Sequence, residues 1–415
     1  MDYTVYAAPL FILAIAIELV YGLRVGRNTY RVNDAVGSLF LGVLSQARKF
    51  VTLGIGGYAY YLVTEYVSLP LMDPGHWWTW VLAMVLYDFC YYWLHRIGHE
   101  RSILWAAHVA HHQSEDYNLS TALRQTSTGF LLGWVFYIPM FMLGIPAAVV
   151  VSVGSLNLIY QFWVHTEHVP KLGWYEWIFV TPSNHRVHHA QNERYMDRNY
   201  GGLFILWDRM FGTFQEELDE EPPVYGIRGA LHSFNPIKAL THIYADMVQD
   251  SVHTASWKDK ARVWVARTGW RPADVAERYP RQKTDLAHFE RYDPQVSPIA
   301  RAYALFQLVA IVGLLFVLQS GAATSYSAGA LLAVFMLLTA ACTAMWLDAR
   351  RADLCVFAEL GRMLLLLMML WSGAPLLTLD VFPLVAGAYL VVNLLWLVPL
   401  TRSADSAVQA GSRFA

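Results

Sequence analysis

Apolar residues form long runs over the first 163 positions of the chain and again after residue 299. A helix needs about 20 apolar residues to cross the hydrocarbon core of a bilayer. The runs predict membrane helices at 6–22, 36–63, 77–94, 129–143, 145–163, 300–319, 326–347, 354–371 and 375–397. Arg48 and Lys49 interrupt the second run, which predicts one bent helix or a re-entrant pair there. The pattern is that of an all-α, polytopic membrane protein.

A polar block lies between the two apolar regions, from residue 164 to 299, and holds most of the charges. We therefore predict a membrane-embedded domain at 1–299, a C-terminal transmembrane helical block at 300–400 and a polar tail at 401–415. Basic residues in the polar block and beside the spans place this block in the cytoplasm by the positive-inside rule. The first run lacks a basic flank before it and Glu18 interrupts it, so we interpret it as a retained membrane segment rather than a cleaved signal.

Composition supports a membrane protein and excludes other classes. Hydrophobic residues make up 56% of the 415 residues and charged residues 15%, whereas about a quarter of an ordinary soluble domain is charged. The net charge of −2 gives no electrostatic basis for binding nucleic acid. Cys90, Cys342 and Cys355 lie in or beside apolar runs and form no CxxC pair, which predicts buried thiols rather than disulfides.

Histidine is the unusual residue, because ten of the 15 lie between positions 95 and 189 in four clusters. The clusters are His95 and His99; His108, His111 and His112; His165 and His168; and His185, His188 and His189. Positions i, i+3 and i+4 share one face of a helix, so each triplet presents its imidazoles on one side. Imidazole binds iron, zinc and copper, and one triplet cannot fill a six-coordinate ion. Several such faces together predict a site for two ions, carried by a cytoplasmic helical cap.

Polar residues near these clusters are candidates for supporting the ligands or the reaction. We select four as candidate catalytic residues: Asp88, Glu100, Asn118 and Asn184. Ligating imidazoles usually donate their second N–H to a carboxylate or a carbonyl. Asp88 lies inside an apolar run, where a carboxylate is costly and usually functional. A solvated surface carboxylate is the alternative for Glu100, and the role of His168 stays open because Pro170 soon ends any helix there.

The histidine clusters contain few carboxylates, unlike the di-iron sites of helical bundles. Two iron ions can reduce oxygen and attack an unactivated C–H bond, whereas two zinc ions activate water for hydrolysis. The spacing does not choose between these chemistries. A metal transporter or store is a third class, but it requires ligands at mid-membrane depth on several spans. The histidines here instead gather where the predicted spans leave the membrane, which argues against transport.

A family resemblance rests on these motifs: YDFCYYWLHR at 87–96, LW at 104–105, HVAHH at 108–112, TPSNHRVHH at 181–189, NYGG at 199–202 and WDRMFGTF at 207–214. Together they are similar to the fatty acid hydroxylase / sterol desaturase superfamily. The resemblance implies an integral membrane enzyme with a histidine-ligated di-iron centre, which hydroxylates or desaturates lipids with O2 and two electrons. It implies as metal ligands His95, His99, His108, His111, His112, His165, His185, His188 and His189.

The extra membrane helices after the histidine region resemble the layout of a subfamily that oxidises glycerol ethers with electrons from a reduced pterin. The resemblance implies an O2-dependent di-iron lipid monooxygenase whose substrate is a glycerol ether, a fatty acyl lipid or a sterol. A desaturase on the same site and a dizinc membrane hydrolase are the alternatives. Zinc can also replace iron on purification, because nitrogen sites bind it more tightly.

The electron donor is expected to lie outside the chain. The sequence has no G-x-G-x-x-G following a strand and no CxxCH haem motif. A reduced pterin or a separate redox protein must then supply the electrons. The basic block 258–291 could dock an acidic donor protein, and the alternative is a surface that faces solvent or lipid headgroups.

Overall fold

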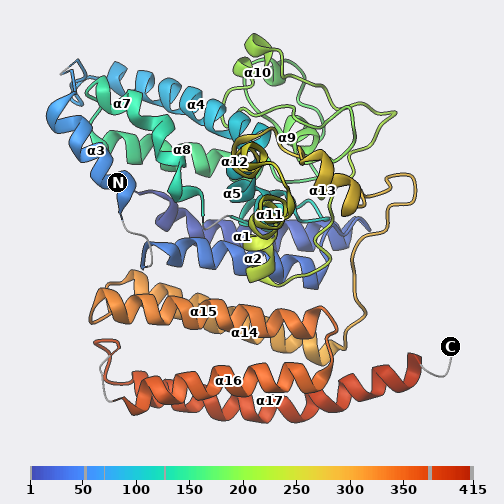
Figure 1. Ribbon diagram of the computed structural model, residues 1–415. Helices are drawn as coiled ribbons and strands as arrows, with labels where there is room; N and C mark the ends of the chain where they lie inside the picture. The colour runs from blue at the N-terminus through green and yellow to red at the C-terminus, as the bar shows by residue number, and fades with distance from the viewer. Residues whose placement is uncertain (1, 51–53, 70, 126–127, 373–375, 412–415) are drawn as a thin grey trace. The chain divides into compact units, whose positions relative to one another are not determined.

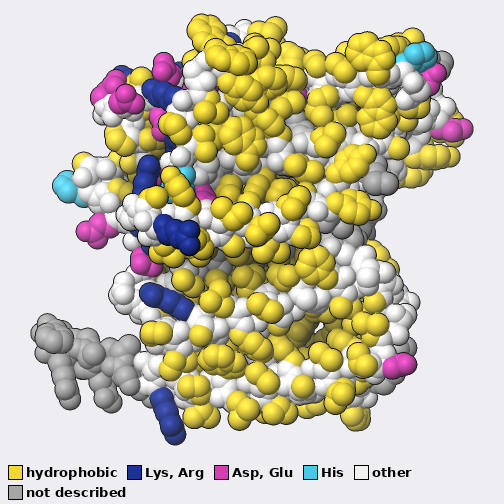
Figure 2. Space-filling view, turned by 180° about the vertical axis from the view of Figure 1, so that it is seen from behind, with side chains coloured by type: hydrophobic (Ala, Val, Ile, Leu, Met, Phe, Trp, Pro, Cys, Tyr) yellow, Lys and Arg dark blue, Asp and Glu magenta, His cyan; other side chains and the backbone are white. Residues whose placement is uncertain are grey.

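The computed structural model describes residues 2–50, 54–69, 71–125, 128–372 and 376–411, and apart from isolated β-bridges the regular structure in these ranges is helical. Five helices of this part are long and apolar enough to cross a membrane. They are Tyr6–Arg24, Pro298–Gln319, Tyr326–Leu347, Ala352–Trp371 and Phe382–Ser403. Figure 2 shows hydrophobic side chains over most of the face in view. The prediction of an all-α membrane protein is confirmed.

The chain divides into two compact units. Unit 1 comprises Met1–Tyr30, Leu53–Leu231 and Leu240–Glu290, and unit 2 comprises Arg31–Thr52, His232–Ala239 and Arg291–Ala415. Residues 31–52 therefore belong with the C-terminal helices, although they follow the first helix directly in sequence. The expected division at residues 299 and 400 stays a prediction.

Unit 1 carries all the clustered histidines. Its helices are α1 (Thr4–Arg24), α3 (Ile55–Tyr66), α4 (Trp77–Glu100), α5 (Ser102–His112), α6 (Leu119–Ala122), α7 (Ile138–Met142), α8 (Ala147–Trp163), α9 (Pro182–His188), α10 (Leu206–Phe211), α12 (Trp257–Val265) and α13 (Ala273–Arg278), while α11 (Pro236–His253) starts in unit 2 and continues into unit 1. The helix α4 packs against α5 and α8 (Figure 1). The helix α1 packs against α6 and α8. The C-terminal end of α4 leads directly into α5, and the Nε2 atoms of His165, just after α8, and of His111 on α5 are 3.3 Å apart.

Small side chains allow α4 and α8 to approach each other closely. Ala83 of α4 and Val153 of α8 belong to one buried apolar cluster. Gly154 of α8 faces the ring of Tyr87, and a Cβ at this glycine would lie 2.8 Å from that ring. The apolar run predicted at 77–94 continues as helix to Glu100. It therefore carries His95 and His99 on the same uninterrupted helix as its apolar part.

The predicted span 36–63 is two separate helices. Its first part forms α2 (Val32–Ala47), a 3-10 turn follows at Arg48–Phe50, and its last part forms α3. The break falls at the charged pair that interrupts the apolar pattern.

The prediction of a spanning helix at 129–143 is wrong. This segment forms two 3-10 turns, Gly129–Leu131 and Gly133–Tyr137, followed by the five-residue helix α7. Glycine at the start of both turns and Pro139 in α7 disfavour a continuous helix, because both residue types have low helix propensity.

Unit 2 consists of α2, α14 (Pro298–Gln319), α15 (Tyr326–Leu347), α16 (Ala352–Trp371) and α17 (Phe382–Gly411). Each of the four C-terminal helices packs against the next, as Figure 1 shows. Phe40, Ile311 and Met336 belong to its main apolar core. Within the bundle, the buried guanidinium of Arg362 pairs with Glu359 at 2.6 Å, as a buried charge in an apolar block requires.

Gly144 offers a test of the turn between α7 and α8. Its φ is +77°, and a Cβ there would lie 2.2 Å from the carbonyl oxygen of Leu69. Gly173 also has a positive φ, +61°, but open space around it. Left-handed backbone costs about 1–2 kcal/mol for a residue with a Cβ, and overpacking adds about 1–3 kcal/mol. We expect Gly144→Ala to lower the thermal unfolding midpoint in detergent clearly more than Gly173→Ala. Equal midpoints for the two variants would contradict the close approach.

Candidate metal centre

Four elements of unit 1 carry the histidines that the sequence singled out. His95 and His99 lie on the last turns of α4, and α5 begins two residues after α4 ends. His165 lies just after the end of α8. The short helix α9 starts with a capping box in which the side chains of Thr181 and Asn184 bond to each other's backbone N–H. This cap fixes where α9 begins and therefore which way its histidines point.

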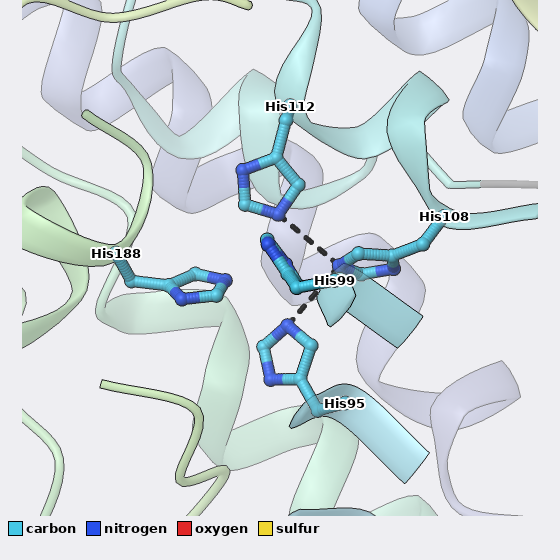
Figure 3. A group of neighbouring side chains, drawn as sticks. All are labelled: His95, His99, His108, His112 and His188. Atoms are coloured by element: carbon cyan, nitrogen blue, oxygen red, sulfur yellow. Dashed lines mark hydrogen bonds between the residues drawn. The ribbon is translucent and has the colours of Figure 1, made fainter. Parts of the chain in front are cut away.

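The nine predicted ligand histidines come together in two groups. Site A contains His95, His99, His108, His112 and His188. Site B contains His111, His165, His185 and His189. Within each group the potential ligand atoms lie within 4.8 Å of one another, and every ring is buried except the half-buried His108. Figure 3 shows the five rings of site A pointing towards a common centre.

Backbone carbonyls fix the orientation of four of these rings. The Nδ1–H groups donate at 2.8–2.9 Å: His95 to Tyr200, His111 to Arg124, His165 to Gln161 and His188 to Arg198. A carbonyl oxygen only accepts, so the proton of each neutral ring must be on Nδ1. Each Nε2 therefore presents a lone pair to the centre of its group.

Two of these lone pairs, on His111 and His165, face each other directly, an arrangement that a cation between them would stabilise. The Nε2 atoms of His111 and His165 are 3.3 Å apart, and neither carries a proton to share. In site A, the Nε2 atoms of His99 and His188 are buried and have no hydrogen-bond partner. Nitrogen pairs 3.1–3.3 Å apart subtend about 95–105° at an ion about 2.1 Å from each nitrogen. The residues present therefore fit a pair of metal ions.

Burial keeps the imidazoles neutral and ready to ligate. Desolvation lowers the pKa of His95 to about 3 and that of His111 to about 4. It also lowers the pKa of His112, His185 and His189 well below the usual range. Because the charged form of a histidine cannot bind a metal, this environment favours ligation at neutral pH. In the described part of the chain, neither group contains a carboxylate.

Asp88 supports the site through a loop rather than through a histidine. Its buried carboxylate accepts from the backbone N–H groups of Leu203 (2.7 Å) and Phe204 (2.9 Å). It also accepts from the Trp207 indole (2.9 Å) and the Asn157 amide (2.7 Å). Residues 198–204, which we call the Tyr200 loop, supply the carbonyls that orient His95 and His188. Asp88 therefore holds the segment that holds the ligands.

Asp208 holds the other part of the same loop, and the sequence analysis did not select it. Its carboxylate accepts from the N–H groups of Tyr200 and Gly201, both at 2.8 Å, and from the Thr213 hydroxyl at 2.7 Å. A Cβ on Gly201 would lie 2.5 Å from the carbonyl oxygen of Phe204, so only glycine fits this tight loop. The signal that could have found Asp208 is the one that identified Asp88, a carboxylate within a bulky apolar stretch.

The other selected residues have structural partners. Glu100 pairs with Arg96 at 2.9 Å and keeps 24% of its side chain exposed. Asn118 caps α6 and donates to the carbonyl of Thr29 at 2.7 Å. Asn184 belongs to the cap of α9. Their catalytic roles stay predictions, while the contacts of both asparagines position segments next to the histidines.

Comparisons with known proteins agree with this site. A model of the fatty acid hydroxylase family matches residues 80–213. The human alkylglycerol monooxygenase is 40% identical over 275 residues, which cover 65% of this chain and 60% of the relative. The Xenopus tropicalis alkylglycerol monooxygenase is 35% identical over 315 residues, covering 75% of this chain and 69% of the relative. An ornithine lipid hydroxylase of Rhizobium tropici is 30% identical over 153 residues, covering 36% and 45%. No solved structure matches.

Fold and site together define a membrane protein with a histidine-rich metal centre, and the matches supply the family. The family model covers both ends of the histidine region, from α4 to Thr213. The chain belongs to the fatty acid hydroxylase family, among relatives that are named monooxygenases and hydroxylases of lipids. The resemblance stated from the sequence is therefore confirmed. The human match spans 60% of that protein's length.

The two loop-holding carboxylates should matter for metal binding without being ligands. We expect Asp88→Ala and Asp208→Ala to weaken metal binding about 10–100-fold, as the loss of outer partners usually does, and to lower turnover while leaving some metal bound. Metal affinity is measured by competition with a chelator at constant pH. Asp219→Ala is the control, because that side chain is 97% exposed. If Asp88→Ala kept wild-type metal affinity and turnover, Asp88 would have a purely structural role.

Proposed function

We propose that this chain is an O2-dependent di-iron monooxygenase that hydroxylates a membrane lipid, with a glycerol ether as the leading substrate. The main observation behind this proposal is the pair of histidine groups whose Nε2 lone pairs converge. The names of the relatives that match at 35–40% identity support the glycerol ether. Fatty acyl lipids and sterols are the competing substrates.

The ligand count supports iron rather than zinc. Site A offers five imidazoles, whereas a structural zinc ion takes four ligands in a tetrahedron. The two groups adjoin, since the rings of His112 and His189 stack with centroids 4.3 Å apart. Two iron ions held there would supply the binding and reduction of O2 and the oxidant for a C–H bond.

The chain's own side chains would hold the site dry and rigid. Trp105 packs on His99 at 5.0 Å between centroids, and Tyr200 packs on the same ring at 5.4 Å. Tyr117 lies against His165 and His189 at 5.7 and 5.3 Å. These aromatic walls keep water from the imidazoles. A dry site with fixed ligands restricts where a lipid carbon can approach, and positioning errors of about 1 Å change such rates strongly.

The electrons would come from outside, and we favour a reduced pterin over a docked acidic protein. Part of the basic block is neutralised within the chain: Arg271 and Arg281 both pair with Asp250, at 2.9 and 3.0 Å. Arg281 also pairs with Asp246 at 3.2 Å. A surface paired in this way offers less charge to an acidic partner. We place the site on the cytoplasmic side on the strength of the positive-inside pattern.

The function is tested by turnover of iron-loaded protein under 18O2, with and without oxygen, on a mixed pool of glycerol ethers, fatty acyl lipids and sterols. Mass spectrometry identifies the product. Incorporation of label into one lipid, only with O2 present, supports the proposal and names the substrate. Loss of two hydrogens without label would instead show a desaturase. Products formed without oxygen would overturn the oxygenase and favour a hydrolase.

The ligand assignment predicts the effect of single histidine changes. We expect His112→Ala and His188→Ala to abolish turnover and to lower the metal content, because each removes one imidazole from site A. Metal per chain is measured by inductively coupled plasma mass spectrometry beside the turnover assay. His288→Ala is the control, since this histidine lies outside both groups and its side chain is 85% exposed. Wild-type activity in either site A variant would remove that residue from the ligand set.

A further inference from the structure

The first membrane helix contains a buried carboxylate that the proposed chemistry does not use. Glu18 lies in the middle of α1, within the apolar span Tyr6–Arg24. Only 17% of that span is buried inside the protein, yet Glu18 is 7% exposed. An ionisable side chain in such a helix is costly and usually has a function. The partners of Glu18 therefore indicate what it does.

Three uncharged donors surround this carboxylate. Its Oε1 accepts from the hydroxyl of Thr166 at 2.5 Å. Its Oε2 accepts from the backbone N–H of Leu119 at 2.8 Å and from the hydroxyl of Tyr30. A carboxylate that accepts several hydrogen bonds holds its donors in fixed places, because charge-assisted bonds are about twice as strong as neutral ones.

Two of the three segments that Glu18 contacts lead to site B. Thr166 directly follows His165, a member of that site. Leu119 begins α6, and the chain then reaches Arg124, whose carbonyl accepts from Nδ1 of His111, another member. One side chain of α1 therefore fixes two of the four imidazoles of site B through their neighbours.

The face of α1 that carries Glu18 is built to dock there. Phe11 lies on the same face, two turns before Glu18, and its ring stacks on Phe162 of α8 with centroids 4.0 Å apart. Gly22 lies one turn after Glu18, and a Cβ there would lie 3.3 Å from Nε2 of His168, in the segment that follows His165. Next to it, the ring of Tyr21 meets His168 edge-on at 5.1 Å. The contact of α1 with the segments of site B thus extends over several turns.

Site A is held by different residues. Its outer carbonyl partners come from the Tyr200 loop, which Asp88 and Asp208 hold. Asp88 and Asp208 therefore stabilise the loop that orients histidines of site A, and Glu18 stabilises the segments next to histidines of site B. Removal of one of these carboxylates should therefore weaken metal binding at one site and spare the other.

We propose that Glu18 is a positioning residue for site B, and that the first membrane helix is part of the metal centre. The inference rests on the proposed function only in requiring that both groups bind a metal ion. Removal of Glu18 frees Thr166 and Leu119, so His165 and His111 lose their fixed directions. Site B then releases its ion while site A keeps its own.

The test counts iron in the full-length, iron-loaded protein purified in detergent, after a fixed exposure to a chelator. We expect Glu18→Ala to lower the content from about two ions per chain to about one. Glu18→Gln keeps the shape and part of the hydrogen bonding, so it should retain more iron than Glu18→Ala. Thr166→Val removes only the link beside His165 and should shift the content in the same direction. Glu65→Ala, an exposed carboxylate on α3, should leave it unchanged.

Double variants assign the loss to one site. Glu18→Ala combined with His165→Ala should lose no more iron than either single variant. Glu18→Ala combined with His99→Ala should retain almost none. Two ions retained in Glu18→Ala, or loss of both ions in Glu18→Gln and Thr166→Val, would overturn the inference. The iron count does not depend on turnover. If the variants lose iron selectively but the wild-type protein does not oxygenate lipids, the proposed function is wrong and this inference still stands.

Discussion

The centre depends on one constraint, the direction in which nine clustered imidazoles, eight of them buried, present their lone pairs. Burial makes these rings neutral, and each Nδ1–H bond to a backbone carbonyl turns the opposite nitrogen inward. Lone pairs held 3.3 Å apart repel unless a cation lies between them. The protein must therefore hold the rings rigidly before a metal arrives. Most of the architecture of unit 1 serves this requirement.

The carbonyls that orient the rings come largely from irregular segments, which need support of their own. The Tyr200 loop has no helical hydrogen bonds to stabilise it, and Asp88 and Asp208 satisfy four of its N–H groups instead. Glu18 does the same for the start of α6. Buried carboxylates that face amides rather than cations are therefore the common device. They link α4, α10 and α1, which carry Asp88, Asp208 and Glu18, to the loops that fix the ligands.

The clustering of the histidines could be read from the sequence, whereas the residues that support them could not, for a physical reason. Spacing at i, i+3 and i+4 is local, so the helix faces of α4, α5 and α9 could be read directly. The partners of Glu18 and Asp208 lie far away in sequence or in a loop without a pattern. Only the cost of burying a carboxylate in an apolar stretch could have indicated these two residues. Asn118 and Asn184 are helix caps. Their place near the histidines was visible from the sequence, but the cap geometry was not. The run at 129–143 failed as a span because apolar composition does not report the helix-breaking effect of its glycines and proline.

The same carboxylates also bear on the charge of the centre. In the proposed centre, nine neutral imidazoles would do nothing to offset the charge of two divalent ions, and a buried charge needs compensation nearby. Asp88, Asp208 and Glu18 have uncharged donors as their hydrogen-bond partners, so their negative charge is not cancelled by an ion pair. In unit 2, by contrast, the negative charge of the buried Glu359 is neutralised by its ion pair with Arg362. Anionic groups one layer behind neutral ligands would thus hold two cations without filling coordination positions that oxygen needs.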